Sequence, residues 1–174
     1  MDERNIISEW FYLYSNDVYN FLVYYQGSKD VHDLVQEVFI KAMKGVSSFR
    51  NEANPKTWLI SIARHVAIDH ARKKKRRIDD ATAPLEEQIT IGNSDVPDDV
   101  LVENESMQDL YMAIKALKSN YRDVVMLRGI EDMSTKETAA VLGWTESKVK
   151  QTYHRAKKSL QKQLLEKGDI AHGS

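Results

Sequence analysis

STKETAAVLGWTESKVKQTYHRAKKSL, residues 134–160, is the stretch that decides how the C-terminal part of this chain folds. Ser134 and Glu137 match a capping box, in which each side chain accepts a hydrogen bond from an unpaired backbone N–H at the start of a helix. Gly143 tolerates the positive φ of a sharp turn, and Thr145 is a good N-cap for a second helix. The stretch therefore predicts two helices joined by a tight turn.

The second of these helices is expected to have one apolar and one basic side. Its apolar residues recur at helical spacing, at Val149, Tyr153, Ala156 and Leu160. This layout is typical of a helix-turn-helix motif, whose second helix enters the major groove of DNA. An ordinary helical hairpin with a solvated charged face is the alternative. The other side holds Lys148, Lys150, Gln151, His154, Arg155 and Lys157.

Charge divides the chain into three parts, although the net charge of its 174 residues is only −1. Residues 1–77 hold 13 Lys and Arg against 9 Asp and Glu, and residues 110–174 hold 12 against 7. Residues 78–109 hold 10 Asp and Glu and no Lys or Arg. Two basic modules that suit a polyanion thus flank an acidic connector.

The sequence also excludes several classes of protein. It contains no cysteine, which excludes disulfides and cysteine-bound metals and fits a reducing compartment. No apolar run is long enough to cross a membrane, and the charged start, MDERNIISEW, lacks a signal-peptide pattern. We therefore expect a cytoplasmic protein.

Helical periodicity without strand-type alternation predicts an all-α fold of two small lobes. In the first lobe, helices are expected over residues 5–26, 31–46 and 55–75. Asn16-Asp17 could divide the first of these helices, Asp30 is the expected cap of the second, and Asn54 that of the third.

The second lobe is expected to begin after a linker without helical periodicity. Helices over residues 101–117 and 121–128 then precede the helix-turn-helix. Ser119 or Asn120 is the expected cap of the second of these helices, and Gly129 its end. The chain is expected to fray after Lys167-Gly168.

The predicted helix over residues 31–46 has an apolar face and a second, mainly polar stripe. Because the stripe includes an outward-facing isoleucine, it suits contact with a partner helix, and a plain solvated face is the equal alternative. The apolar face comprises Val31, Leu34, Val35, Val38, Phe39 and Ala42, and the stripe Asp33, Gln36, Glu37, Ile40 and Lys44.

The predicted helix over residues 55–75 combines a basic face with an indole. Lysine and arginine neutralise phosphates, and Trp58 can stack on an unpaired base, so the helix suits nucleic acid. Burial of Trp58 in the core is the alternative, and both can hold for different edges of the ring. Leu59, Ile62, Ala63 and Val66 are expected to face inward, and Lys56, Thr57, Arg64, His65, Arg72 and residues 73–77 outward.

His65 and Asp69 stand four residues apart on one helix face, which raises a metal site as a further alternative. His70 points elsewhere, and Glu131-Asp132 belongs to no catalytic pattern. A metal-dependent nuclease is therefore the least supported function, and no cofactor or metal is expected.

Several motifs of this chain resemble, in sequence and in their order along the chain, those of bacterial sigma factors of the extracytoplasmic-function (ECF) branch of the sigma-70 family. DLVQEVFIKA, residues 33–42, is similar to that family's helix for docking the clamp helices of the RNA polymerase β′ subunit. Ser48-Phe49-Arg50 and TWLISIAR, residues 57–64, resemble its element for opening and recognising the −10 region. Residues 134–160 resemble its −35-recognition element.

The resemblance implies a sigma domain 2 over residues 1–77, a flexible acidic linker over 78–102, a sigma domain 4 over 103–167 and a tail over 168–174. Such a protein is not an enzyme. It binds core polymerase through the β′ clamp helices and the β flap, directs initiation at promoter DNA, and is usually restrained by an anti-sigma factor that is often membrane-anchored. A free-standing helix-turn-helix regulator is the alternative, but it leaves residues 33–42 without a role.

The resemblance also assigns residues to each contact. The polymerase-docking set is Asp33, Gln36, Glu37 and Ile40. The −10 set is Phe49, Lys56, Thr57, Trp58, Arg64, His65 and Arg72. The −35 set is Ser147, Lys148, Lys150, Gln151, His154 and Arg155. The chain departs from the family pattern at His65, where asparagine is frequent, at Trp144, where a smaller aliphatic residue is common, and at Gln151-Thr152.

Overall fold

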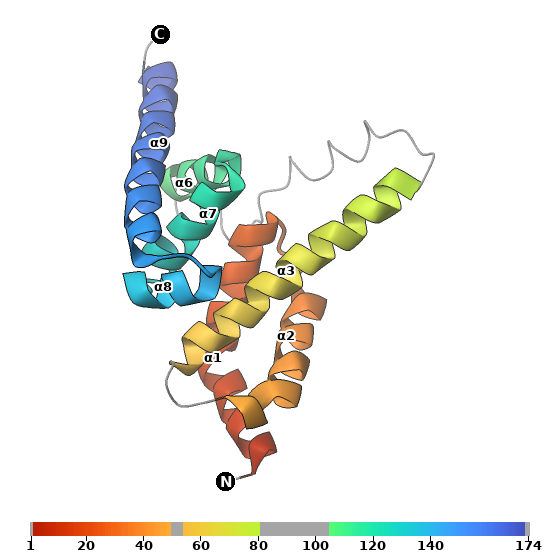
Figure 1. Ribbon diagram of the computed structural model, residues 1–174. Coiled ribbons are helices and arrows are strands. Elements are labelled where there is room, and N and C mark those ends of the chain that lie inside the picture. The colour runs from red at the N-terminus through yellow and green to blue at the C-terminus, as the bar shows by residue number, and fades with distance from the viewer. Residues whose placement is uncertain (1, 50–53, 81–104, 173–174) are drawn as a thin grey trace. The chain divides into compact units, whose positions relative to one another are not determined.

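The computed structural model describes residues 2–49, 54–80 and 105–172. All regular structure in these residues is helical, which confirms the expected all-α class. The chain divides into two compact units, and each is described by itself (Figure 1). The predicted linker, apart from its first residues, and Arg50 of the expected −10 element lie outside the described residues.

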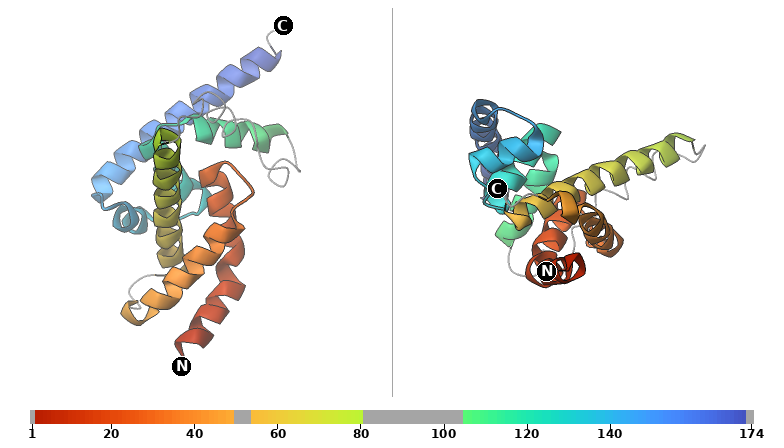
Figure 2. Two further views of the ribbon diagram at one scale, coloured as in Figure 1. Left: turned by 90° about the vertical axis from the view of Figure 1, so that its right-hand side faces the viewer. Right: turned by 60° about the horizontal axis from the view of Figure 1, so that its bottom comes forward.

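The first unit is a bundle of helices that all pack against one another. Its elements are α1 (Glu3–Gln26), α2 (His32–Gly45), the 3-10 turn η1 (Val46–Ser48) and α3 (Pro55–Asp80). Figures 1 and 2 show α3 crossing α1 and α2, with its C-terminal half projecting beyond them. The expected apolar face of α2 is confirmed, because Val31, Leu34, Val35, Val38, Phe39 and Ala42 are all buried.

Two predicted boundaries in this unit are wrong. α1 runs unbroken through Asn16 and Asp17, because buried residues on either side, such as Ile7 and Val18, continue one helical face. Asp30 does not cap α2, because Val31 occupies the cap position and the helix starts without a side-chain cap.

The start of α3 agrees with the sequence, but its end does not. The Asn54 side-chain oxygen accepts a hydrogen bond from the Lys56 N–H at 2.9 Å, which confirms the cap. The helix then continues to Asp80, five residues beyond the end expected at residue 75. The lysine and arginine run over residues 73–77 consists of good helix formers, and no proline or glycine follows it before Asp80.

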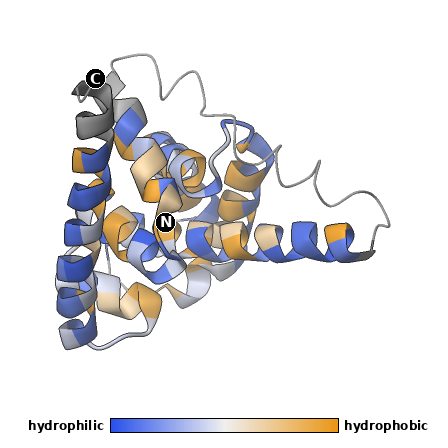
Figure 3. Cartoon of the chain, turned by 90° about the horizontal axis from the view of Figure 1, so that it is seen from above, coloured by the Kyte–Doolittle hydropathy of each residue, from blue (hydrophilic) through white to orange (hydrophobic). Residues whose placement is uncertain are grey.

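The second unit is organised around its last helix. Its elements are α6 (Glu105–Ala116), α7 (Ser119–Val124), the π-helical turn η2 (Val125–Ile130), α8 (Thr135–Leu142) and α9 (Glu146–His172). α9 contacts all of the others. Figure 3 shows α9 as largely hydrophilic along its visible side, while Val149 and Ala156 are fully buried on its inner side.

Helix ends in the second unit also differ from the sequence-based expectation. α7 begins at Ser119 with Lys118 in the cap position and no side-chain cap, and the π turn carries the helix past Gly129. α9 continues through Gly168 to His172, so most of the predicted tail is helical. A single glycine weakens a helix by about 1 kcal/mol but does not end it.

Candidate nucleic-acid interface

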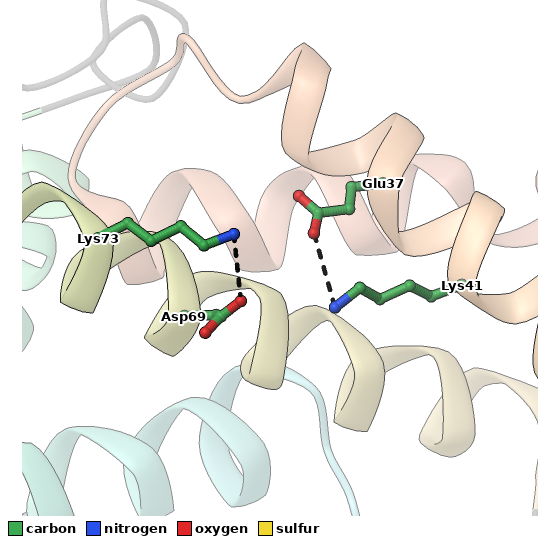
Figure 4. A network of polar contacts seen from close by, with 4 residues as sticks. All are labelled: Glu37, Lys41, Asp69 and Lys73. Atoms are coloured by element: carbon green, nitrogen blue, oxygen red, sulfur yellow. Dashed lines mark ion pairs between the residues drawn. The ribbon is translucent and has the colours of Figure 1, made fainter.

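The outer face of α2 carries the polar stripe that the sequence predicted. Asp33 and Gln36 are exposed, Ile40 is 54% exposed, and Glu37 is half-buried. We call these four residues the docking stripe. The Glu37 carboxylate lies 3.6 Å from the Lys41 ammonium one turn further along α2 (Figure 4). The stripe therefore combines acidic, amide and apolar groups on one accessible helix face.

An apolar groove of about 390 Å³ lies beside the docking stripe, between α1 and α2. The rings of Phe11 and Phe39 meet edge to face inside it, with centroids 4.9 Å apart. Phe11 is 49% exposed, so its ring remains accessible at the surface of the groove. The groove is lined by Ile7, Ser8, Phe11, Gln36, Phe39, Ile40 and Met43.

Three aromatic side chains from separate elements of the first unit meet in what we call the aromatic cluster: Trp10 of α1, Phe49 after η1, and Trp58 of α3. The ring centroids are 5.2 Å apart for Trp10 and Phe49, 5.8 Å for Trp10 and Trp58, and 5.1 Å for Phe49 and Trp58. All three residues are half-buried, so each ring is held by its neighbours and still reaches the surface. Part of Trp58 is therefore buried against its neighbours, and part of it remains exposed.

The backbone around η1 fixes this cluster. The Ser48 hydroxyl donates to the Gly45 carbonyl at 2.7 Å, and the Phe49 N–H donates to the Val46 carbonyl at 3.0 Å. A Cβ on Gly45 would lie 3.4 Å from the Trp58 ring, so the glycine lets the indole pack closely against the end of α2. Trp58 is therefore confined on several sides.

α3 presents the basic face that the sequence predicted, with one exception. His65 and Arg72 are exposed, and the Lys56 ammonium lies 3.8 Å from the Asp17 carboxylate of α1. Thr57 is only 7% exposed, so its expected outward orientation is wrong. It occupies the first turn of α3, where the helix packs against the bundle. Arg64 is half-buried.

The projecting half of α3 is strongly basic. His70, Lys73, Lys74 and Arg77 line a shallow hollow of about 300 Å³. The Asp69 carboxylate lies 3.6 Å from the Lys73 ammonium (Figure 4). A surface of this kind attracts phosphates.

The residues considered for a metal-dependent nuclease do not gather. Among the side chains that the structure describes, no group of three or more His, Asp or Glu lies close enough to hold a metal ion. Glu131 is buried, whereas Asp132 is exposed at a positive φ of 53°. The two carboxylates therefore do not face a common site.

The helix-turn-helix is confirmed at each of its local signals. The Glu137 N–H donates to the Ser134 hydroxyl at 3.0 Å, and the Ser134 N–H donates to the Glu137 carboxylate at 3.4 Å. Gly143 has a φ of 70°, and the Lys148 N–H donates to the Thr145 hydroxyl at 3.1 Å. α8 and the start of α9 are thus positioned by hydrogen bonds that the sequence specifies.

The predicted −35 residues all lie on the exposed side of α9, while Val149, Thr152 and Ala156 are buried on the other. Tyr153 and Leu160, which were expected to be buried, are half-buried at the border. The exposed set is Ser147, Lys148, Lys150, Gln151, His154 and Arg155.

Aromatic rings support cations along this helix. The Lys148 ammonium lies 4.3 Å from the centroid of the Trp144 ring. The Tyr153 ring has the Lys157 ammonium at 4.6 Å and the Arg128 guanidinium of η2 at 5.3 Å. The sequence analysis did not predict these pairs. Each lysine follows its aromatic residue by four positions, and this spacing could have indicated the contacts.

Comparisons with known proteins agree with this arrangement. Residues 11–77 match the family model described as "Sigma-70 region 2", and residues 107–160 match "Sigma-70, region 4". Within the described residues, no helix is long and apolar enough to cross a membrane.

Relatives of known function cover nearly the whole chain. The ECF RNA polymerase sigma factor SigX of Bacillus subtilis is 38% identical over 154 residues, which is 87% of this chain and 79% of the relative. The RNA polymerase sigma factor YlaC of the same organism is 31% identical over 166 residues, 94% and 95% of the two chains. The fold is shared with the sigma factor RpoE of Bartonella quintana, solved in complex with the anti-sigma factor NepR, at a TM-score of 0.73 and 24% identity over 90% of this chain and 95% of that one.

The match to region 2 leaves a free-standing helix-turn-helix regulator without support. The chain belongs to the ECF branch of the RNA polymerase sigma factors.

Proposed function

We propose that three surfaces of the described units carry polymerase docking, −10 recognition and −35 recognition in this sigma factor. The docking stripe binds the clamp helices of the polymerase β′ subunit, and the observation that carries this is its exposure opposite a fully buried face. Ile40 offers apolar area there, and Asp33 and Glu37 offer charge for steering. The second unit adds a contact with the β flap.

The −10 element is captured by the aromatic cluster and the basic face of α3. Phe49 and Trp58 stack on bases of the non-template strand, because an unpaired base exposes a π-face that a duplex hides. The cationic and polar groups that hold the strand's phosphates and bases are Lys56, Arg64, His65 and Arg72. Thr57 joins this set only if the first turn of α3 moves, since its side chain is buried in the free protein.

Promoter melting by this route needs no nucleotide hydrolysis by the sigma factor. Unstacking a base costs a few kcal/mol, and stacking on a protein ring returns about 1–3 kcal/mol per base. Strand capture therefore lowers the free energy of the open duplex. Accordingly, we assign the chain no catalytic activity of its own.

The exposed side of α9 recognises the −35 duplex. Its cations contact phosphates, and Gln151 and His154 are placed among them to reach base edges in the major groove. The tight turn and the Thr145 cap set the angle at which α9 leaves α8, so the first turns of α9 lead into the groove.

Regulation by an anti-sigma factor fits the surfaces that the free protein exposes. The RpoE relative was solved with an anti-sigma factor bound. We infer that a comparable partner covers the docking stripe of this chain. The protein would work in the cytoplasm, because core polymerase acts there.

Run-off transcription tests the proposal directly. Purified bacterial core polymerase is incubated with and without the protein on a pool of promoter fragments. We expect initiation at defined start sites only when the protein is present, and the active fragments then reveal the −10 and −35 sequences. Specific binding to duplex promoter DNA by the protein alone, without initiation, would contradict the proposal.

A further inference from the structure

Trp10 connects α1 to both aromatic residues assigned to the −10 strand. Its ring meets Phe49 at 5.2 Å and an interplanar angle of 80°, and Trp58 at 5.8 Å and 71°. Both contacts are edge to face, a geometry that aromatic pairs favour. Neither the sequence pattern nor the family resemblance assigned Trp10 a role in nucleic-acid binding.

The position of Phe49 explains why such a contact matters. Its backbone follows η1 in an extended conformation (φ −69°, ψ 118°), so the residue lies beyond the last turn of helix on that side. An aromatic side chain at the surface loses rotamer freedom when a ligand orders it. A ring that already rests against two indoles loses less of that freedom on binding.

Trp10 also limits the surface that the two rings leave for a ligand. It packs edge to face against both Phe49 and Trp58, and a Cβ on Gly45 of α2 would lie 3.4 Å from the Trp58 ring. An unpaired base must therefore stack on the parts of the rings that these neighbours leave exposed.

We propose that Trp10 is a positioning residue for capture of the −10 strand: it holds Phe49 and Trp58 in the orientation in which they stack on unpaired bases. This inference rests on the proposed function of the aromatic cluster. Trp10 itself need not touch DNA.

The test uses the full-length protein bound to core polymerase and a fluorescent single-stranded oligonucleotide with the −10 non-template sequence found by run-off transcription. Trp10→Leu, which removes the ring, is expected to weaken strand binding by about three- to ten-fold. Trp10→Phe retains a ring edge and is expected to stay within about two-fold of the wild type. Tyr12→Leu is the matched control on the same helix, because Tyr12 is 87% exposed, and it should leave the affinity unchanged.

A double-mutant cycle separates positioning from general destabilisation. Because Trp10 acts through both Phe49 and Trp58, Trp10→Leu should have a smaller effect on strand affinity in a Trp58→Leu background than in the wild type. Affinity for core polymerase should not change in either background. Additive effects of the two substitutions, or an equal loss of core affinity, would overturn the inference. If Trp10→Leu does not fold, Trp10→Met takes its place, with the same outcomes.

The proposed function and this inference fail differently. No binding of the −10 strand by the wild-type holoenzyme would overturn the function assigned to the aromatic cluster. Normal wild-type binding together with equal binding by Trp10→Leu would overturn only the role of Trp10.

Discussion

The two units offer nucleic acid side chains of opposite character. The first unit presents half-buried rings that contact one another, whereas the second presents exposed cations on one face of α9, with Trp144 and Tyr153 beneath some of them. The difference matches the two forms of DNA. A single strand exposes the faces of its bases, which stack on rings, while a duplex hides them and offers phosphates and groove edges, which bind cations and amides.

The two surfaces also differ in how they are assembled. The aromatic cluster brings together residues 10, 49 and 58 from separate elements, so its geometry depends on the packing of the whole bundle. The cationic face of α9 comes from one helix and the turn before it. A substitution that disturbs helix packing should therefore alter the aromatic cluster even when it lies far from the three rings. The cationic face should change only when α9 itself is disturbed.

Among the substitutions that test the difference between the two surfaces, Val149→Asp is expected to have the largest effect. Val149 is fully buried on α9, and an unpaired carboxylate there costs on the order of 3–5 kcal/mol, comparable with the stability of a small domain. The second unit should unfold and −35 duplex binding by the holoenzyme should disappear, while binding of the −10 strand is retained. Thermal unfolding by circular dichroism and DNA titrations check this.

Lys158→Asp is the matched control, because Lys158 is exposed on the same helix and is not among the −35 residues. It should leave the fold intact. Loss of −10 strand binding in Val149→Asp would contradict the independence of the two surfaces.

The next largest effect is expected from Glu37→Arg, which tests the proposed polymerase contact of the docking stripe. Reversing the charge at the docking stripe should weaken core binding by about 2 kcal/mol, roughly 30-fold, and should reduce −10 and −35 function together. Titration of labelled core polymerase measures it. Lys41→Ala, which removes the partner of Glu37 at 3.6 Å without reversing a charge on the stripe, should stay close to the wild type. Normal core affinity in Glu37→Arg would argue against the docking assignment.

Arg155→Ala is expected to have an intermediate effect, on the affinity for the −35 duplex. Removing one charged phosphate contact is expected to cost about 1.5 kcal/mol in −35 duplex binding and to lower the slope of log affinity against log salt by about one. Binding of the −10 strand should not change. Titrations at several salt concentrations measure the slope, with Lys162→Ala, exposed on the same helix, as the control. An unchanged slope would show that Arg155 does not contact the phosphate backbone of the DNA.

The smallest effect is expected from Trp144→Leu. The Trp144 ring holds the Lys148 ammonium at 4.3 Å, and an exposed cation–π contact contributes about 0.5–1 kcal/mol. We therefore expect a two- to five-fold loss of −35 duplex affinity. Trp144→Phe keeps an aromatic face and should recover most of it. Equal losses for both variants would mean that the indole contacts DNA itself.

Much of the second unit could be predicted because its signals are local. The capping box of Ser134 and Glu137, the turn at Gly143 and the cap at Thr145 involve residues three or fewer apart, or a single φ angle. Such interactions form between neighbours in the chain and need no knowledge of the rest of the fold. The spacing that placed the −35 residues on one side of α9 is a property of the helix alone.

Helix ends were predicted less well, because they depend on what surrounds them. Asp30 is a good cap by residue type, yet α2 begins one residue later than such a cap requires, with Val31 in the cap position. Asn16 and Asp17 disfavour a helix by propensity, but packing on both sides of them outweighs that preference in α1. Thr57 looked outward by spacing, and the way α3 packs on the bundle buries it.

By itself, the sequence determined the all-α class, the buried face of α2, the helix-turn-helix and the family resemblance, because periodicity and capping are written in short-range patterns. Only the tertiary structure decided that Trp10 meets Phe49 and Trp58, and that Phe11 and Ile40 border one groove. Those contacts join residues far apart in the chain. Their geometry follows from how whole helices cross, which no local pattern specifies.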